Sequence, residues 1–204
     1  MSDMQRRDLI VLDAHGVVFN RPFPGFVRDL AIRCGFDPAE HWGRWKGVWR
    51  EPFWGGRLTS RELWAQLAPG LDHRVLEAEL EARFEPGPLF DAVTAGDRPL
   101  WLLSNHRSEW LLPRLQRFGL ADRFERVLVS DAIGAAKPTP AAFDELVAES
   151  ARRRVLFVDD NETNVEAARR LGLRAARVDT VPIDPAVWGA TRARVLRPSL
   201  EGAA

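Results

Sequence analysis

Polar residues of five types follow four short apolar runs in this 204-residue sequence, and these types suit one kind of chemistry. The runs are residues 9–12, 100–103, 127–129 and 155–158. In chain order, the residues that follow them are Asp13 and His15, Ser104 and Asn105, Lys137 after a short excursion, and Asp159, Asp160 and Asn164. Carboxylates suit a hard divalent cation, whereas a lysine and a hydroxyl suit phosphate oxygens. One carboxylate remains free to attack, so the set indicates phosphoryl transfer.

The elements that must position these residues follow from the same apolar runs. Each run predicts a strand buried on both faces, and helical patterns over 108–118, 140–151 and 162–171 separate the later runs. Strands that alternate with helices predict a parallel sheet with helices on both faces. Ligands bind beyond the carboxyl ends of such strands, so the polar residues are expected at one edge of the sheet.

The first predicted strand does not follow this rhythm, because about 80 mostly helical residues separate it from the second. Helices are predicted at about 25–34, 38–50, 60–68 and 72–84, with Pro and Gly residues between them. We therefore expect an α/β protein with a Rossmann-like parallel sheet core flanked by helices. The core is expected from residues 1–19 and 88–204, with an inserted small α-helical cap from residues 20–87 and the active site between the two.

Composition excludes several classes of partner. Lys and Arg number 29 and Asp and Glu number 29, so no basic field exists to hold nucleic acid. No apolar run approaches the roughly 18 residues that a membrane-spanning helix needs, and the apolar stretch ending at Asp13 is too short for a signal peptide. The single Cys34 excludes an internal disulfide. We expect a cytoplasmic protein with no membrane partner, and the oligomeric state stays open.

These residues resemble the four motifs of the haloacid dehalogenase superfamily, which are an Asp-x-Asp loop, a Ser or Thr, a Lys and an acidic pair. FVDDNETNVEAARRLGL resembles the fourth motif, KPTPAAFDEL the third and LLSN the second. The segment FWGGRLTSRELWAQL resembles the cap of the subgroup with small helical caps. That subgroup includes sugar-phosphate phosphatases and the phosphatase domain of soluble epoxide hydrolase.

The resemblance implies a magnesium-dependent phosphatase that acts on a small phosphomonoester. Asp13 would attack phosphorus and form an aspartyl-phosphate that water then hydrolyses. The side chains of Asp13 and Asp160 and the main-chain carbonyl of His15 would bind Mg²⁺. Asp159 and Asn164 would orient the waters on the metal.

The resemblance also implies three phosphate-binding residues. Ser104 would bond a phosphate oxygen, and Asn105 would bind alongside it and help to position the loop. Lys137 would neutralise the negative charge shared by Asp13 and the phosphoryl group.

His15 departs from the family pattern, because the phosphatases carry a second Asp at this position as general acid and base. An imidazole is a common general acid and base, and such catalysis contributes on the order of 10² to 10⁴ in rate. Neighbouring carboxylates and a bound phosphate favour the imidazolium, whereas Mg²⁺ opposes it. Three outcomes stay open: an active phosphatase that uses His15, a slow enzyme suited to good leaving groups, or a protein that binds phosphate or a partner without turnover.

The dehalogenases of the family are the other enzyme hypothesis. They attack carbon with the same Asp, need no metal, and usually have Tyr at the position of His15. The adjacent Asp159 and Asp160 argue against this hypothesis, because carboxylates beside Asp13 would repel one another without a cation.

Tryptophans gather in the predicted cap, where five of the eight fall between Trp42 and Trp64. Trp42, Trp45 and Trp49 have helical spacing, which predicts packing inside the cap. Because caps close over active sites, one or two residues are expected to face the substrate, from among Arg44, Trp45, Arg50 and Trp54. His106 is expected either at the mouth of the site or in a solvated loop.

Overall fold

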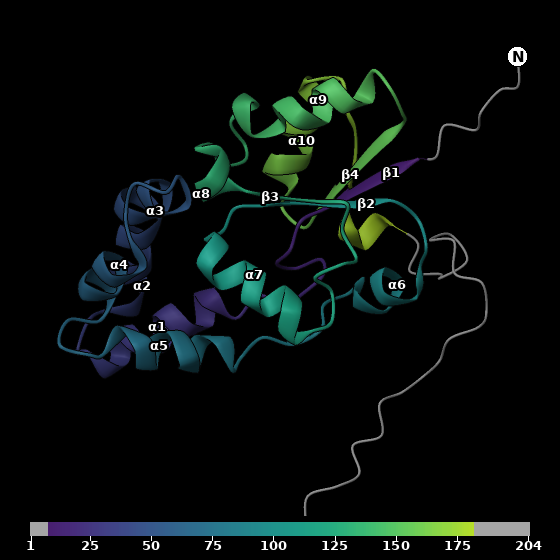
Figure 1. Ribbon diagram of the computed structural model, residues 1–204. Coiled ribbons are helices and arrows are strands. Elements are labelled where there is room, and N and C mark those ends of the chain that lie inside the picture. The colour runs from purple at the N-terminus through teal and green to yellow at the C-terminus, as the bar shows by residue number, and fades with distance from the viewer. Residues whose placement is uncertain (1–7, 182–204) are drawn as a thin grey trace, which may run out of the picture.

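The computed structural model of the protein describes residues 8–181, and its centre is a parallel sheet. The sheet has five strands in the order β3-β2-β1-β4-β5, all parallel (Figure 1). They are β1 (Leu9–Leu12), β2 (Leu100–Ser104), β3 (Arg126–Val129), β4 (Val155–Asp159) and β5 (Arg174–Arg177). The predicted fold class and the four predicted strands are confirmed. The fifth strand was not predicted, since its sequence RAAR contains no apolar run.

Alternation along the strands divides the core into two layers. Leu9 and Val11 belong to one buried cluster, whereas Ile10 and Leu12 belong to the other. Residues two apart in a strand point to the same face, which produces this division. Strand β3 lies at the edge of the sheet, and in its predicted run of 127–129 only Val127 is half-buried, so burial on both faces was wrong for that residue.

Helices cover both faces of the sheet (Figure 1). One face packs against η2 (Pro140–Phe143), α9 (Asp144–Ser150) and α10 (Glu162–Arg170). The other packs against α6 (Phe90–Ala95) and α7 (Ser108–Arg117). Two short elements complete this part of the chain, α8 (Ser130–Ile133) and η3 (Val178–Thr180). The helix predicted over 140–151 begins with a 3₁₀ turn at Pro140.

A helical segment, residues 23–81, stands between β1 and β2. Its elements are α1 (Phe23–Arg33), α2 (Pro38–Arg44), the π-helix η1 (Trp45–Trp49), α3 (Arg50–Trp54), α4 (Ser60–Leu67) and α5 (His73–Glu81). Side chains of Asp37, Thr59 and Asp72 accept backbone N–H bonds and cap three of these helices. The helix predicted over 38–50 runs on to Trp54, with the π-helical turn in its middle. Within residues 8–181, no helix has the length and apolar character that crossing a membrane requires.

The chain leaves the sheet layer and returns to it at one place. Phe19 and Pro86 pair in an antiparallel bridge. The N–H of Asn20 donates to the carbonyl of Glu85 at 3.0 Å, and the N–H of Gly87 donates to that of Val18 at 2.8 Å. The two connections therefore lie side by side near the predicted ends of the cap. The division into a cap of residues 20–87 and a core of 1–19 and 88–204 stays a prediction, and that core extends beyond the described residues at both ends.

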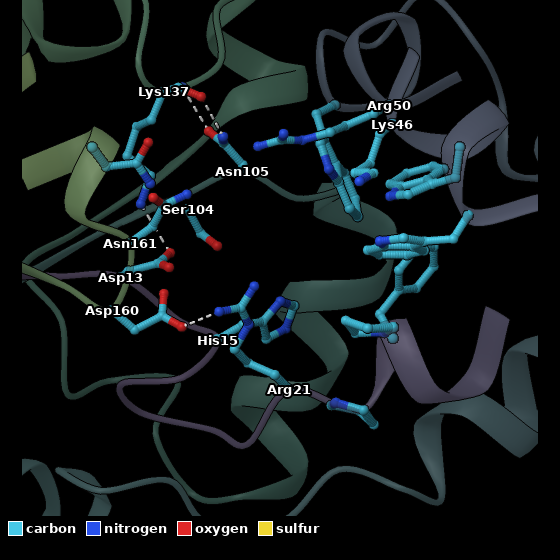
Figure 2. Close-up of a pocket in the computed structure, with 17 residues that line it drawn as sticks. Asp13, His15, Arg21, Lys46, Arg50, Ser104, Asn105, Lys137, Asp160 and Asn161 are labelled. Atoms are coloured by element: carbon cyan, nitrogen blue, oxygen red, sulfur yellow. Dashed lines mark hydrogen bonds and ion pairs between the residues drawn. The ribbon is translucent and has the colours of Figure 1, made fainter. Parts of the chain in front are cut away.

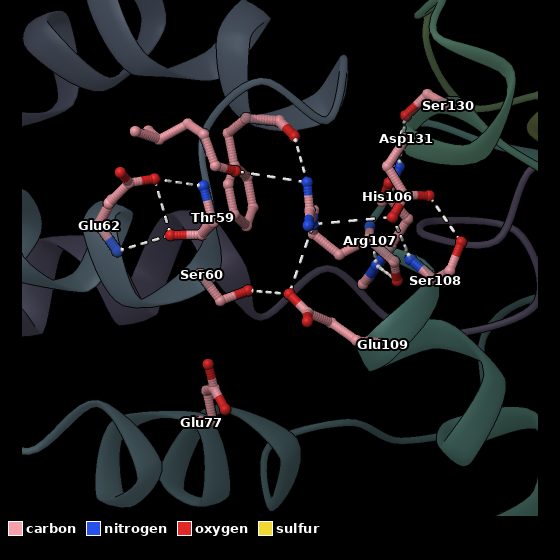
Figure 3. A network of polar contacts seen from close by, with 12 residues as sticks. Thr59, Ser60, Glu62, Glu77, His106, Arg107, Ser108, Glu109, Ser130 and Asp131 are labelled. Carbon is pink, nitrogen blue, oxygen red and sulfur yellow. Dashed lines mark hydrogen bonds and ion pairs between the residues drawn. The ribbon is translucent and has the colours of Figure 1, made fainter.

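Polar contacts tie the helical segment to the loop that follows β2 (Figure 3). The guanidinium of Arg107 donates to the carbonyls of Phe53 at 3.5 Å and Leu58 at 3.3 Å. The hydroxyl of Ser60, at the start of α4, donates to the carboxylate of Glu109 on α7. These contacts hold α3 and the start of α4 close to the carboxyl ends of the strands.

Candidate active site

A cavity of about 270 Å³ lies at the carboxyl edge of the sheet (Figure 2). Asp13 directly follows β1, and Ser104 ends β2, so the parallel strand direction brings both to this edge. The structure gathers all the predicted site residues here. The cavity is lined by Asp13, His15, Ser104, Asn105, Lys137, Asp160 and Asn164. Asp159 lies directly behind the lining, fully buried, and contacts Lys137 and Asn164.

Lys137 provides a fixed positive charge beside Asp13. Its Nζ lies 3.0 Å from Oδ1 of Asp13 and 2.7 Å from Oδ2 of Asp159, and it donates to the carbonyl of Leu103 at 2.7 Å. Burial by itself lowers the pKa of Lys137, but the two carboxylates outweigh burial and raise that pKa. The ammonium group, whose three hydrogens all have acceptors, is therefore charged at neutral pH.

Asp13 is the carboxylate that the cavity leaves available. Its Oδ1 accepts hydrogen bonds from the N–H of Ala14 at 2.8 Å and contacts Lys137. Within residues 8–181, Oδ2 makes no such contact. Burial, with a smaller contribution from the charges of Asp159 and Asp160, outweighs the opposing effect of Lys137 and raises the pKa of Asp13 from 3.8 to about 7. Without a further cation, Asp13 is thus only partly ionised at neutral pH.

The acidic residues fit a divalent cation. Carboxylate oxygens of Asp13, Asp159 and Asp160 all lie within 4.8 Å of one another. Burial and the charge of Asp159 raise the pKa of Asp160, which shows that its anion is costly here even beside Arg21. The buried Oδ1 of Asn164 has no hydrogen-bond partner in the described part of the chain. Crowded oxygen donors and an acceptor without a donor match a hydrated Mg²⁺ ion, so the residues fit the predicted metal.

The side chain of Asn105 is hydrogen-bonded to the backbone of Lys137, whereas the hydroxyl of Ser104 has no hydrogen-bond partner within residues 8–181. The amide of Asn105 donates to the backbone carbonyl of Lys137 and accepts from its N–H, both at 2.7 Å. This pair positions the Lys137 loop against the end of β2. Ser104 lines the cavity, and its hydroxyl makes no hydrogen bond to any residue from 8 to 181. The hydroxyl is therefore free to bond a ligand, and direct phosphate binding by both residues stays a prediction.

His15 is held by a buried arginine. Nη1 of Arg114 lies 2.9 Å from Nε2 of His15 and 3.1 Å from Nε2 of His106. A guanidinium only donates hydrogen bonds, so the imidazole of His15 accepts at Nε2 and, when neutral, carries its proton on Nδ1. Nε and Nη2 of Arg114 donate to Glu81 at 2.9 and 2.6 Å.

The same contacts decide the charge of both histidines. Burial lowers the pKa of His15 well below its ordinary value, and the charges of His106 and Arg114 lower it further. Burial and Arg114 likewise lower the pKa of His106. His15 is therefore a neutral imidazole at neutral pH. His106 is 1% exposed and does not line the cavity, so neither the mouth of the site nor a solvated loop was right.

Sequence reasoning missed several residues of the site, among them Arg21, Arg114 and Gly16, as well as Lys46 in the cavity lining. Arg21 forms an ion pair with Asp160 at 2.5 Å, and Arg114 holds His15. Neither residue stands beside a motif, so only the tertiary contact identifies them. Gly16 carried a signal, because it follows the strand-end Asp13 and His15. Its φ is +80°, and a Cβ placed there would lie 2.2 Å from Oδ2 of Asp160.

The helical segment supplies the opposite wall of the cavity. Of the four residues expected to face a substrate, Trp45, Arg50 and Trp54 line the cavity, whereas Arg44 is exposed outside it. Trp45 and Trp54 are also buried in the hydrophobic core, so packing and lining are not exclusive roles. Trp42 and Lys46 join the lining.

Residues 56–172 match the family described as haloacid dehalogenase-like hydrolase. The chain belongs to this family. The resemblance found in the four motifs is therefore confirmed for this hydrolase, and its matched region includes Ser104, Lys137 and the acidic pair at 159–160.

Relatives of this hydrolase include two named phosphatases. A phosphoglycolate phosphatase from Yersinia pseudotuberculosis is 27% identical over 130 residues, which cover 61% of this chain and 56% of the relative. The match thus spans little more than half the length of that protein. A pyrimidine 5′-nucleotidase from Escherichia coli is 28% identical over 189 residues, which cover 81% of this chain and 83% of the relative.

Solved structures share the fold. A HAD family enzyme from Bacteroides thetaiotaomicron, in complex with magnesium and inorganic phosphate, aligns with a TM-score of 0.66 at 19% identity. The alignment covers 84% of this chain and 93% of that one.

Proposed function

We propose that this hydrolase is a Mg²⁺-dependent phosphatase that hydrolyses a small phosphomonoester through an aspartyl-phosphate on Asp13. The contact that carries the proposal is the 3.0 Å approach of Lys137 Nζ to Asp13, within a cluster that also contains Asp159. It places a positive charge next to the attacking carboxylate, where the phosphoryl oxygens would lie. The phosphatase relatives and the magnesium and phosphate complex of the structural relative support the same chemistry.

In this proposal, Ser104 and Lys137 bind the phosphate and Asp13 is the nucleophile. The substrate phosphate binds to the hydroxyl of Ser104 and the ammonium of Lys137. Asp13 attacks phosphorus, so a bond from its carboxylate oxygen to phosphorus forms and the bond to the leaving oxygen breaks. Water then attacks the phosphorus, which releases inorganic phosphate and regenerates Asp13.

Four residues around Asp13 would hold Mg²⁺ or support the groups that contact it. When bound, Mg²⁺ neutralises charge on the phosphoryl oxygens and on the carboxylates. The side chains of Asp13 and Asp160 and the carbonyl of His15 would hold it. Asp159 fixes Lys137, and the unpartnered Oδ1 of Asn164 would accept from a water on the metal.

His15 contributes to this chemistry as a neutral imidazole. Its Nε2 accepts from Arg114, so the proton on Nδ1 serves as a hydrogen-bond donor and not as a transferable acid. A leaving oxygen must then depart without full protonation by His15. This favours substrates whose leaving groups have a low pKa, the second of the three outcomes left open by the sequence.

The helical segment serves as the cap in this proposal. Its residues form one wall of the cavity, and the contacts of Arg107 and Ser60 hold it over the strand ends. A cavity of about 270 Å³ suits a small molecule.

The proposal is tested with p-nitrophenyl phosphate, with and without Mg²⁺. We expect turnover that requires Mg²⁺ and that Asp13→Asn abolishes. Chloride release from 2-chloropropionate is measured in parallel, and we expect none. Unchanged turnover by Asp13→Asn, or halide release without metal, would show that the assignment is wrong.

A further inference from the structure

Two cations of the helical segment face the candidate active site. Lys46 in η1 and Arg50 at the start of α3 both line the cavity that contains Asp13. Figure 2 shows them on the wall across the cavity from Asp13 and Asp160. Neither makes an ion pair or a hydrogen bond with another residue between 8 and 181. Lys46 is exposed and Arg50 is half-buried, and both line the cavity without a partner in the described part of the chain.

The cations of the sheet edge are, in contrast, already paired. Lys137 contacts Asp13 and Asp159, and Arg21 forms its ion pair with Asp160. A phosphate bound at the sheet edge is expected to contact the ammonium group of Lys137. Lys46 and Arg50 are thus available to bind a different part of the ligand.

The position of Lys46 and Arg50 along the chain is itself unfavourable without an anion. They are four residues apart in a continuous helical stretch, and like charges at this spacing repel each other. An anion bound between them would remove the repulsion and form charge-assisted hydrogen bonds to both. The π-helical turn that begins at Trp45 belongs to a class of distortion that is frequent at functional sites.

The summed formal charge of the occupied site is positive, which favours binding of a second anionic group. Three carboxylates, Lys137 and Arg21, with a divalent cation and a phosphate dianion, would carry one net negative charge. Lys46 and Arg50 add two positive charges. One positive charge therefore remains for the part of the substrate beyond its phosphate.

The wall around these cations is aromatic. Trp42, Trp45, Trp54 and Phe23 all line the cavity beside Lys46 and Arg50. The rings of Phe23 and Trp45 pack with centroids 4.8 Å apart, and those of Trp45 and Trp54 with centroids 5.6 Å apart. These aromatic side chains displace part of the water on one side of the cations, and a lower local dielectric constant strengthens an ion pair formed there.

We propose that the substrate carries a second anionic group, a carboxylate or a second phosphate, which Lys46 and Arg50 bind across the cavity from Asp13. This inference rests on the proposed function and adds the class of substrate: a small phosphomonoester with anionic groups at both ends.

Binding of three phosphonates tests the inference apart from turnover, since a P–C bond is not hydrolysed by this chemistry. Isothermal titration with Mg²⁺ compares propylphosphonate, 3-phosphonopropionate and ethane-1,2-bisphosphonate. Hydrogen bonds between charged groups lead us to expect that the ligand with the matching second anionic group binds about tenfold or more tighter than propylphosphonate. A preference for the carboxylate or for the second phosphonate identifies which anion the site takes.

Substitutions of Lys46 and Arg50 test whether these two residues cause the tighter binding of the ligand with a second anionic group. Lys46→Gln and Arg50→Gln should each reduce the ratio of dissociation constants, and the double variant should bring it close to one. Arg44→Gln, which removes a nearby cation outside the cavity, is the matched control and should leave the ratio unchanged.

The outcomes separate the two proposals. Equal binding of all three phosphonates by the wild type, or an unchanged ratio in the double variant, would overturn the inference about Lys46 and Arg50. Failure of propylphosphonate to bind, together with no hydrolysis of p-nitrophenyl phosphate, would instead overturn the proposed phosphatase function.

Discussion

Nη1 of Arg114 lies 2.9 Å from Nε2 of His15, although the two residues are 99 positions apart in the sequence. Arg114 is 1% exposed, and its other nitrogens donate to Glu81. One buried guanidinium therefore connects α7, α5 and the loop after β1. The contact gives His15 a defined tautomer and ties its position to the packing of the helices.

Arg114→Gln should destabilise the protein strongly. Breaking a buried ion pair costs at least about 3 kcal/mol of stability. We expect a value near this lower limit, because Glu81 is 31% exposed and water can hydrate its carboxylate once Arg114 is replaced. Urea denaturation measures the change. Arg117→Gln is the matched control, since Arg117 also lies 3.2 Å from Glu81 but is 43% exposed. It should cost about 1 kcal/mol or less, as exposed pairs do. Equal losses for the two variants would contradict the special role of Arg114.

Substitutions of His15 should separate hydrogen bonding from proton transfer. His15→Gln keeps a donor but cannot titrate, so turnover of p-nitrophenyl phosphate should stay within a few-fold of the wild type. A loss on the order of 10² or more would instead show that His15 transfers a proton.

His15→Asp should retain or raise phosphatase activity, because a carboxyl group can give up and take back a proton between the two steps. The gain should be greatest for alkyl phosphates, whose leaving groups need protonation, and on the order of 10² in rate. Steady-state rates with an alkyl and an aryl phosphate provide the comparison. A decrease with both substrates would contradict this expectation.

Mg²⁺ affinity should depend on pH through Asp13. The pKa of this carboxyl is raised from 3.8 to about 7 in the metal-free protein, so below that pH a proton must leave when the cation binds. Affinity should fall about tenfold per pH unit below 7 and level off above it. Titration calorimetry between pH 5 and 8, with Asp13→Asn as control, measures the slope. An affinity that is constant over this range would count against Asp13 as a ligand.

The metal-free protein should show the opposite trend in stability. A raised pKa means that the folded state holds the proton more tightly than the unfolded state. The stabilisation from Asp13 is thus fully present below pH 3.8 and is lost as pH rises through about 7. Added Mg²⁺ should restore stability at pH 8, as measured by thermal unfolding. No effect of Mg²⁺ at that pH would contradict the expectation.

Gly16→Ala should disrupt the metal site. Gly16 has φ +80°, and the new Cβ would lie 2.2 Å from Oδ2 of Asp160. Gly35→Ala is the matched control, because Gly35 has φ +75° but nothing within 4 Å of its Cβ position. Both variants should lose about 1 to 3 kcal/mol from backbone strain. Only Gly16→Ala should also lose Mg²⁺ affinity, and equal Mg²⁺ binding by both would show that the contact with Asp160 is unimportant.

Much of the fold could be predicted because apolar runs bounded by polar residues are strong local signals. The four runs became β1 to β4, and Asp13, Ser104 and Asp159 lie at their ends as expected. Strand β5 was missed, since an edge strand needs no buried apolar run. The short helices α6 and α8 were missed for a related reason, because six and four residues carry too little periodicity to detect.

The sequence by itself determined which residues meet at the edge of the sheet, because parallel strands end on one side and the residue after each strand must lie there. The tertiary structure alone decided the environment of those residues. Arg21 reaches Asp160 across 139 positions, Arg114 reaches His15 across 99, and Lys46 and Arg50 turn toward the cavity. Periodicity shows which face of a helix is buried. Charge pairing and desolvation depend instead on which faces meet in space. Pairing and desolvation set the pKa values of the site residues and leave Lys46 and Arg50 without a partner in the described part of the chain.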